Sequence, residues 1–508
     1  MITRKFSLAA AVVTATALTL TACGAGETQS ADLATINVMA PFLEAQPPTP
    51  DGAVQQKLEE LTGKDVNITW TPNASYEDKM NITLASSEIP HVLVVQSKSP
   101  GFVKNAEAGA FWDLTEKLDE YPNLKSTFPE VEQNASINGK VYGVFRARNP
   151  IRSAVMFRQD WLDKLGLEAP KTTEDLYKVA KAFTEQDPDG NGQADTWGIT
   201  IPKWGALGSN SPYDMIETWY GAGNRWTEKD GKLIPSFETE EFIEANRFVK
   251  KMVDEKLINP DFATFDGTKW NEPFFNGKGG IIVDVDSRVG VLINLFKQAN
   301  PNDFENKVGF VGGLEGPDGL HTHPTDGYSG FLAIPKTSVR TEAELKTVLE
   351  FLDKMNSKDT AVLLNNGIEG VNFTVEDGKA ATIKPETPEG KVVNTDIKSY
   401  AQLGTNVTGN NFYPVKQASE YEQEVFDQRI EVMAEDLKSA VYNPAAAFVS
   451  PTYVAKGAQL DNIVADARIK YLAGQIDEKG LKDAISLWKT SGGDKVQEEI
   501  NKLWQDSK

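Results

Sequence analysis

Short apolar runs alternate along the chain with longer segments in which apolar residues recur at helical spacing. The short runs are rich in Val, Ile and Phe, and they predict strands at residues 36–39, 66–70, 92–95, 141–145, 154–157, 281–285 and 331–334. The longer segments predict helices at residues 51–61, 172–184, 239–255, 342–355, 420–437 and 455–473. Strands that alternate with helices in this way are typical of an α/β architecture.

The body of the chain shows no boundary between sequential domains. It contains neither an internal repeat nor a Pro/Gly-rich linker after residue 36. Because 508 residues exceed the usual size of one domain, we expect lobes that are assembled from discontinuous segments.

Composition narrows the possible chemistry. The 73 acidic residues outnumber the 52 basic ones, and the net charge of −21 argues against a nucleic-acid partner. A single cysteine excludes an internal disulfide and a cysteine-cluster metal site. Only three histidines are present, and we expect His321 and His323 to be an exposed loop pair without a third metal ligand. The chain therefore resembles an acidic globular protein with few catalytic groups.

The first 22 residues have the pattern of a secretory signal. Arg4 and Lys5 precede an apolar run over 6–20 that is short and interrupted by threonine, unlike a membrane span. The run ends in LTACG, which resembles the lipobox of bacterial lipoproteins, where the cysteine is lipidated. We expect residues 1–22 to be a lipoprotein signal peptide, Cys23 to carry diacylglyceryl and palmitate chains, and 23–35 to be a flexible tether. The alternative is an ordinary secreted protein with a chance cysteine.

The most specific motifs lie between residues 157 and 199. In order, they are FRQDWLDKLGL from Phe157, DPDGNG from Asp187 and WGI from Trp197. This run resembles the family 1 extracellular solute-binding proteins, the lipid-anchored receptors of ATP-binding-cassette (ABC) sugar importers. The similarity extends over essentially the whole mature chain, with one departure at residues 89–91, where IPH stands in place of the usual Pro-Asp.

This resemblance implies a type II periplasmic-binding-protein-like fold, with two α/β lobes joined by hinge crossovers. By analogy, lobe 1 would hold residues 36–145 and 285–350, and lobe 2 would hold 146–284 and 351–508. A ligand that contacts both lobes would favour closure by its differential affinity for the two states. The resemblance further implies a monomeric, non-enzymatic receptor on the outer face of the cell membrane. It would bind a carbohydrate, an oligosaccharide, and deliver it to the permease subunits of an ABC transporter.

One segment has the spacing of an EF-hand calcium loop. Oxygen-bearing residues stand at loop positions one, three, five, seven and nine, with glycine at position six: Asp187, Asp189, Asn191, Gln193 and Asp195, with Gly192. Position twelve is Gly198 in place of the usual bidentate glutamate. We expect a structural Ca²⁺ ion here. The alternative is a metal-free Asx turn, because the same residues favour turns.

Candidate ligand-binding residues follow from the chemistry of sugars. A sugar ring has one apolar face and a rim of hydroxyl groups, so aromatic rings and charged side chains are expected to line its site. The candidates are aromatic residues in loops near the expected cleft and charged residues near the crossovers: Trp204, Tyr213, Trp219, Trp270, Tyr328, Asp284, Arg288 and Arg148. For the aromatic residues the alternative is a core position, and for the charged residues it is an interlobe salt bridge.

Two rival functions stay open at this point. The first is a secreted glycosidase or lyase, because Asp284 and Asp286 share one strand face and could form a carboxylate pair. The second is a receptor for another solute, such as a peptide, or a sensor that presents its ligand to a histidine kinase. No Gly-x-Ser-x-Gly nucleophile motif is present.

Overall fold

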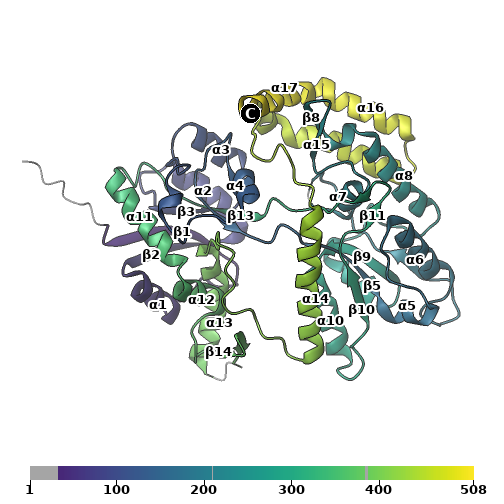
Figure 1. Cartoon of the computed structure of the whole chain (residues 1–508), viewed down its shortest axis with the longest axis horizontal. Coiled ribbons are helices and arrows are strands. Elements are labelled where there is room, and N and C mark those ends of the chain that lie inside the picture. The colour runs from purple at the N-terminus through teal and green to yellow at the C-terminus, as the bar shows by residue number, and fades with distance from the viewer. Residues whose placement is uncertain (1–32, 209, 384–386) are drawn as a thin grey trace, which may run out of the picture.

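The computed structural model describes residues 33–208, 210–383 and 387–508. These residues form two lobes, each built around its own β-sheet (Figure 1). The predicted signal peptide and the lipidation site Cys23 lie outside the described residues, as does the tether up to residue 32.

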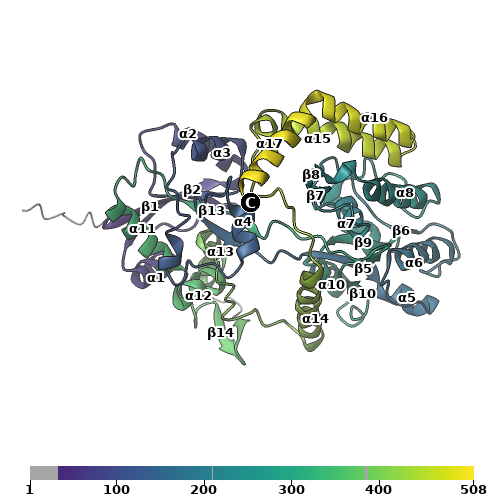
Figure 2. The ribbon, with the colours of Figure 1, turned by 45° about the horizontal axis from the view of Figure 1, so that its top comes forward.

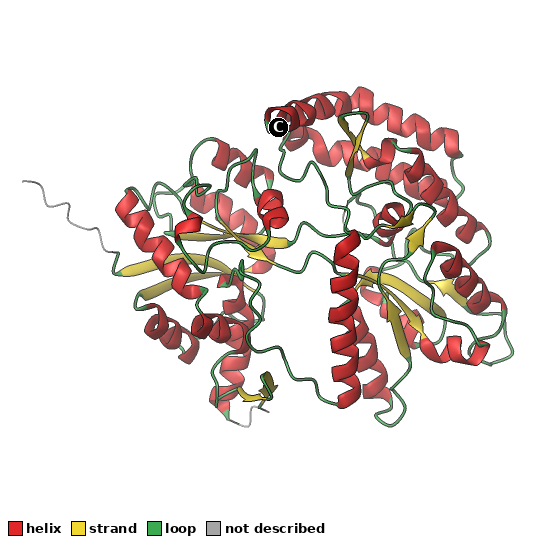
Figure 3. Cartoon of the chain, viewed as in Figure 1, coloured by secondary structure: helices red, strands yellow, loops and turns green. Residues whose placement is uncertain are grey.

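The sheet of the first lobe has five strands in the order β2-β1-β3-β13-β4. Their bounds are β1 Thr35–Phe42, β2 Asp65–Pro72, β3 Val92–Val95, β4 Val144–Ala147 and β13 Tyr328–Ala333. The first three strands are parallel and β13 runs antiparallel to its neighbours. All four residues of β3 are buried, because helices cover both faces of the sheet at its centre (Figure 3).

The helices of the first lobe come from two separate parts of the chain. They are α1 Ala53–Thr62, α2 Tyr76–Leu84, α3 Pro100–Glu107, α4 Pro129–Ala135, α11 Glu342–Met355, α12 Lys358–Asn366 and α13 Pro388–Tyr400. A small hairpin, β14 Phe373–Glu376 and β15 Lys379–Thr382, follows α12. Helix α1 packs against α11, α12 and α13, which joins the two parts into one core.

The second lobe has a four-stranded sheet in the order β10-β5-β9-β6. Its strands are β5 Ser153–Arg158, β6 Trp197–Ile199, β9 Gly279–Val285 and β10 Val308–Val311. The lobe also has two hairpins. One pairs β7 Trp226–Lys229 with β8 Lys232–Pro235, and the other pairs β11 Glu315–Gly316 with β12 Gly319–Leu320. The helices that flank this sheet are α5 Gln159–Leu165, α6 Thr173–Glu185, α7 Pro212–Trp219, α8 Glu240–Asp254, α9 Asn271–Phe275 and α10 Arg288–Ala299.

The last part of the chain adds helices to the second lobe. They are α14 Glu420–Asp436, α15 Pro451–Leu472, α16 Glu478–Trp488 and α17 Asp494–Asp506. In Figures 1 and 2, α15, α16 and α17 lie together at the top, and the end of α17 points towards the first lobe. Among the described residues, no helix has both the length and the apolar composition of a membrane span.

The lobe boundaries differ from those expected, which placed 285–350 in the first lobe and 351–508 in the second. Residues 288–311 belong to the second lobe, because β10 pairs with β5 and the apolar side of α10 packs in the same core. The chain returns to the first lobe at β13 and stays there through α13, whose Val393 and Tyr400 are buried in the first core. The chain therefore passes between the lobes near residues 148–151, 324–327 and 417–419.

Candidate functional site

A cavity of about 750 Å³ lies between the two lobes. The first lobe contributes Gln96, Ser97 and Lys98, which directly follow the buried strand β3. The second lobe contributes the start of α15, part of α7 and the β7–β8 hairpin. Aromatic rings line several sides of this cavity, from Trp226, Phe237, Tyr328, Phe448, Tyr453 and Trp488. Both lobes thus supply walls to one site, and the walls mix apolar rings with polar groups.

Lys98 is the polar centre of the first-lobe wall. Its Nζ donates hydrogen bonds of 2.7 Å to the carbonyl oxygens of both Ser136 and Ala446. Burial lowers the pKa of this ammonium to about 8. Because Ser136 follows α4 and Ala446 precedes α15, Lys98 joins the first lobe to the segment that leads into the second-lobe helices.

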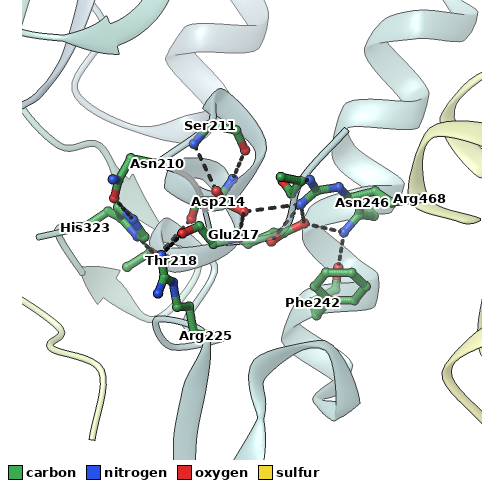
Figure 4. Close-up of polar contacts among 12 residues, drawn as sticks. Asn210, Ser211, Asp214, Glu217, Thr218, Arg225, Phe242, Asn246, His323 and Arg468 are labelled. Carbon is green, nitrogen blue, oxygen red and sulfur yellow. Dashed lines mark hydrogen bonds and ion pairs between the residues drawn. The ribbon is translucent and has the colours of Figure 1, made fainter. Parts of the chain in front are cut away.

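A buried ion network forms the second-lobe floor of the cavity (Figure 4). Arg468 of α15 is fully buried, and its Nη1 lies 3.3 Å from Asp214 Oδ1 and 3.1 Å from Glu217 Oε1. Asn246 of α8 donates a 3.0 Å bond to Glu217 Oε1. Burial raises the pKa of Glu217 to about 7. The network ties α7 to α15 and α8, and it brings two carboxylates to the edge of the cavity.

Local sequence explains how Asp214 reaches this position. Helix α7 begins with a capping box in which Ser211 Oγ accepts from the Asp214 backbone N–H, and the Asp214 carboxylate accepts from the Ser211 N–H. The same carboxylate then serves both as a helix cap and as a partner of Arg468.

His323 is buried beside this network, contrary to the expectation of an exposed histidine pair. Its Nδ1 lies 2.8 Å from Thr218 Oγ1 and its Nε2 lies 3.1 Å from Asn210 Oδ1 (Figure 4). Burial lowers the pKa of the ring to about 4, so the imidazole is neutral at pH 7. Both partners, Thr218 and Asn210, belong to the second lobe, and the crossover at 324–327 follows His323 directly.

Of the eight predicted ligand residues, Tyr328 lines the interlobe cavity. Tyr213 and Trp219 are each 1% exposed and fill the core of the second lobe. Arg148 lines a different, smaller cavity in the first lobe. The structure thus separates residues that the sequence analysis placed in one site.

The other four predicted ligand residues form a cluster within the second lobe, away from the lining of the interlobe cavity. The rings of Trp204 and Trp270 meet edge to face at 5.6 Å, and the Arg288 guanidinium lies 4.3 Å from the Trp270 ring centre. Arg288 also pairs with Asp284, with an Nε–Oδ2 distance of 2.5 Å. The salt bridge between Asp284 and Arg288 lies within the second lobe, so it differs from the interlobe salt bridge that was the alternative for these residues.

Several cavity residues had no place among the predicted ligands. The positions of Gln96 and Lys98 could have predicted a ligand-binding role, because both residues follow a buried parallel strand. Ligands of open α/β sheets bind at the carboxyl ends of strands. Phe448 in the α14–α15 connection and Tyr453 in the first turn of α15 give no such indication, because neither follows a strand.

The predicted calcium loop is exposed and connects α6 to β6. The Asp187 carboxylate accepts hydrogen bonds of 3.0 Å from the backbone N–H groups of Asn191 and Gly192. Asn191 Nδ2 bridges Asp189 and Asp195, and Lys278 forms an ion pair with Asp195. Within the described residues, no group of three or more His, Cys, Asp or Glu side chains is arranged to hold a metal ion. These hydrogen bonds have the form of Asx turns, and the carboxylate and amide oxygens of the loop are hard ligands of the kind that Ca²⁺ prefers.

Comparison with known proteins agrees with this architecture. Residues 45–362 match the model of the family described as bacterial extracellular solute-binding protein. Lipoprotein LipO of Bacillus subtilis (strain 168) is 44% identical over 495 residues, covering 97% of each chain. The polygalacturonan/rhamnogalacturonan-binding protein YtcQ of the same strain is 34% identical over 477 residues, covering 92% of this chain and 91% of YtcQ.

A solved structure shows the same fold. The extracellular solute-binding protein from Bifidobacterium longum subsp. infantis superposes with a TM-score of 0.70 at 18% identity, covering 93% of this chain and 98% of that chain. The predicted α/β, type II periplasmic-binding-protein-like fold is thereby confirmed. The chain belongs to the bacterial extracellular solute-binding protein family.

Proposed function

We propose that this protein captures an oligosaccharide in the interlobe cavity and delivers it unaltered to the permease of an ABC transporter. The observation that carries the proposal is the aromatic and polar lining contributed by both lobes of a solute-binding protein. A volume of about 750 Å³ is in the range of sites for ligands of several rings. The relative YtcQ is a polygalacturonan/rhamnogalacturonan-binding protein, and this similarity supports a saccharide ligand.

Capture would follow from the placement of the lining residues. A saccharide between Lys98 of the first lobe and Trp226 of the second would contact both lobes at once. Such contacts are complete only when the lobes are close together, so binding favours closure by the difference in affinity between the two states. The buried carboxylates beside the cavity are held by Arg468, which suits fixed hydrogen-bond acceptors for sugar hydroxyls.

Placement at the cell surface is the second part of the proposal. We propose that Cys23 carries the lipid anchor and that the protein acts as a monomer on the extracellular face of the membrane. The lipobox-like LTACG and the similarity to lipoprotein LipO support this placement. Metabolic labelling with a palmitate analogue, in the wild type and in Cys23→Ser, tests the anchor. Equal labelling of the two proteins would refute it.

A binding panel tests the proposed ligand class. Purified protein is incubated with oligogalacturonides, neutral oligosaccharides and short peptides, and binding is measured by calorimetry and thermal shift. We expect saturable binding of a saccharide that chromatography recovers unchanged. Trp226→Ala should weaken that binding about tenfold or more, a loss of about 1.4 kcal/mol. Tyr413→Ala, a change outside the cavity lining, should leave it unaltered. Binding of peptides alone, or a cleaved saccharide, would overturn the proposal.

We also propose a structural Ca²⁺ ion in the loop that holds Asp187, Asp189, Asn191, Gln193 and Asp195. Its carboxylate and amide oxygens match the donor set of this ion, and the ion would offset the mutual repulsion of the acidic side chains. Titration with CaCl₂ after chelation should raise the melting temperature, and Asp189→Asn should reduce that gain. An unchanged melting temperature on addition of EDTA and then Ca²⁺ would contradict the site.

A further inference from the structure

A second cavity, of about 240 Å³, lies in the first lobe beside strands β4 and β13. Tyr328 of β13 lines the interlobe cavity, whereas the next residue, Ser329, lines this smaller one. The described linings of the two cavities share no residue. The smaller cavity is therefore separate from the site assigned to the saccharide.

The charge of this cavity is one-sided. Arg146 of β4 and Arg148, which directly follows this strand, both line it. None of the described residues that line the cavity is acidic. The remaining polar lining consists of hydroxyl groups and five amide side chains, from Asn356, Asn365, Gln402, Asn406 and Asn410.

Arg146 is a buried cation without a carboxylate partner among the described residues. It is only 7% exposed. Its Nη1 donates to the Ser329 carbonyl at 3.0 Å and its Nη2 to the Ala401 carbonyl at 3.5 Å, whereas its Nε has no hydrogen-bond partner. Burial, together with the neighbouring charge of Arg148, lowers the pKa of Arg146 to about 10. Burying a charge without a counter-ion is unfavourable in free energy. An anion bound beside Arg146 would therefore stabilise the folded protein.

The wall that joins the arginine segment to Asn356 is held by hydrogen bonds. Asn356 Oδ1 accepts from Thr405 Oγ1 at 2.7 Å and from the Asn406 N–H at 3.1 Å, and the Thr405 carbonyl accepts from the Ala147 N–H at 2.7 Å. Guanidinium groups and amide N–H₂ groups are the donors that bind oxygen-rich anions. The cavity therefore has fixed geometry and a donor set suited to such an anion.

We propose that this cavity binds a small oxyanion, of the size of phosphate or a short carboxylate, between Arg146 and Arg148. The volume equals that of about eight water molecules at ~30 Å³ each, which is too small for an oligosaccharide. The bound anion would lie next to the crossover at 324–327, because the Arg148 N–H donates to the Gly327 carbonyl at 2.8 Å. The oxyanion site goes beyond the proposed transport function and does not depend on it.

Calorimetric titration of the purified protein tests this site. Sodium phosphate and sodium succinate are compared with sodium chloride at equal ionic strength, so that general salt effects cancel. We expect saturable binding of at least one of the two oxyanions. Binding of phosphate only, or of succinate only, would identify which oxyanion chemistry the cavity accepts. Heats no larger than those of chloride for both anions would overturn the proposal.

Variants of the two arginines locate the site. Arg148→Gln should weaken the anion affinity about tenfold or more, since hydrogen bonds to charged groups contribute strongly. Arg146→Lys retains the charge but loses the planar fork, so its affinity should also fall. Arg340→Gln removes an exposed arginine of the same lobe and should bind as the wild type. Circular dichroism confirms that each variant is folded. Wild-type affinity in Arg148→Gln would place the anion elsewhere and refute the assignment.

Discussion

At the residue scale, the floor of the cavity depends on one buried cation. Arg468 is the ion-pair partner of both Asp214 and Glu217. Arg468→Met would leave two buried carboxylates without a cation, and removing one partner of a buried pair typically costs about 3–5 kcal/mol. We expect a loss of that order in the free energy of unfolding, measured with urea.

Arg247 offers a matched control for this change. It also contacts two carboxylates, those of Glu240 and Glu478, but at the surface. Because exposed ion pairs contribute about 0–1 kcal/mol, Arg247→Met should change the stability by no more than that. If the two variants lost the same free energy of unfolding, burial would not make the Arg468 ion pairs more important for stability than exposed ones.

The same network predicts two opposite pH dependences. Burial raises the pKa of Glu217 to about 7 and lowers that of His323 to about 4. Between about pH 4.5 and 6.5, the folded state therefore holds an extra proton on Glu217 and lacks one on His323, relative to the unfolded chain. The Glu217 contribution to stability falls as the pH rises, and the His323 contribution grows.

Single variants separate these two contributions. Relative to the wild type, Glu217→Gln should gain stability as the pH rises from 4.5 to 6.5, and His323→Asn should lose it, each with a limit of about 1.4 kcal/mol per pH unit. Urea unfolding at several pH values measures both differences. Differences from the wild type that stay constant with pH would contradict the opposed pKa shifts.

At the scale of elements, the segment from 443 to 449 connects the two lobes without belonging to either sheet. Lys98 holds the Ala446 carbonyl, and the Asn138 side chain accepts from the Val449 N–H at 2.9 Å. Immediately afterwards, Thr452 at the start of α15 is bound to Glu499 of α17. Hydrogen bonds from the first lobe thus hold the backbone of this segment, whereas Ala445 packs in the second-lobe core.

This arrangement predicts that Lys98 controls the order of the segment. Lys98→Met removes the donor to two carbonyl oxygens, so the amides of 443–449 should exchange hydrogen faster, as measured by mass spectrometry. Lys104→Met, on the exposed side of α3, should not alter this exchange. Wild-type exchange rates in Lys98→Met would show that the segment is held by other contacts.

Individual elements were predictable where the local pattern is strong. The expected strand at 92–95 and helix at 342–355 coincide with β3 and α11, because one is continuously apolar and the other begins at a Thr341–Glu344 capping box. The lobe boundaries were not predictable in this way. They depend on the pairing of Val308 with Arg158, which are 150 residues apart, and local periodicity carries no information about such a pairing.

The candidate site shows the same limit. Tyr328 was expected among the aromatic residues near the cleft, and it lines the interlobe cavity from the start of β13. Trp219 was assigned by residue type alone, and an aromatic ring in a helix suits a core as well as a cleft. The sequence did not indicate that Arg468, an arginine in a long helix, forms buried ion pairs. Its partners on α7 are some 250 residues away in the sequence.

At the scale of the whole molecule, the two lobes have separate hydrophobic cores and are joined by three crossovers. Units with their own cores unfold separately unless an interface couples them, so calorimetry should resolve two thermal transitions in the absence of ligand. A saccharide that contacts both lobes stabilises the folded form of each one. At a concentration of 100 times Kd, mass action gives a stabilisation of about 2.7 kcal/mol.

We therefore expect a saccharide identified in the binding panel to raise both transitions and to bring them closer together. Small-angle scattering should show a smaller radius of gyration at the same saturation, because closure reduces the distance between the lobes. In Trp226→Ala, the same concentration should produce smaller changes in both measurements. If one transition moved while the other and the scattering profile stayed as in the free protein, the saccharide would contact one lobe only. Binding would then proceed without closure, and capture between the lobes would have to be abandoned as the mechanism.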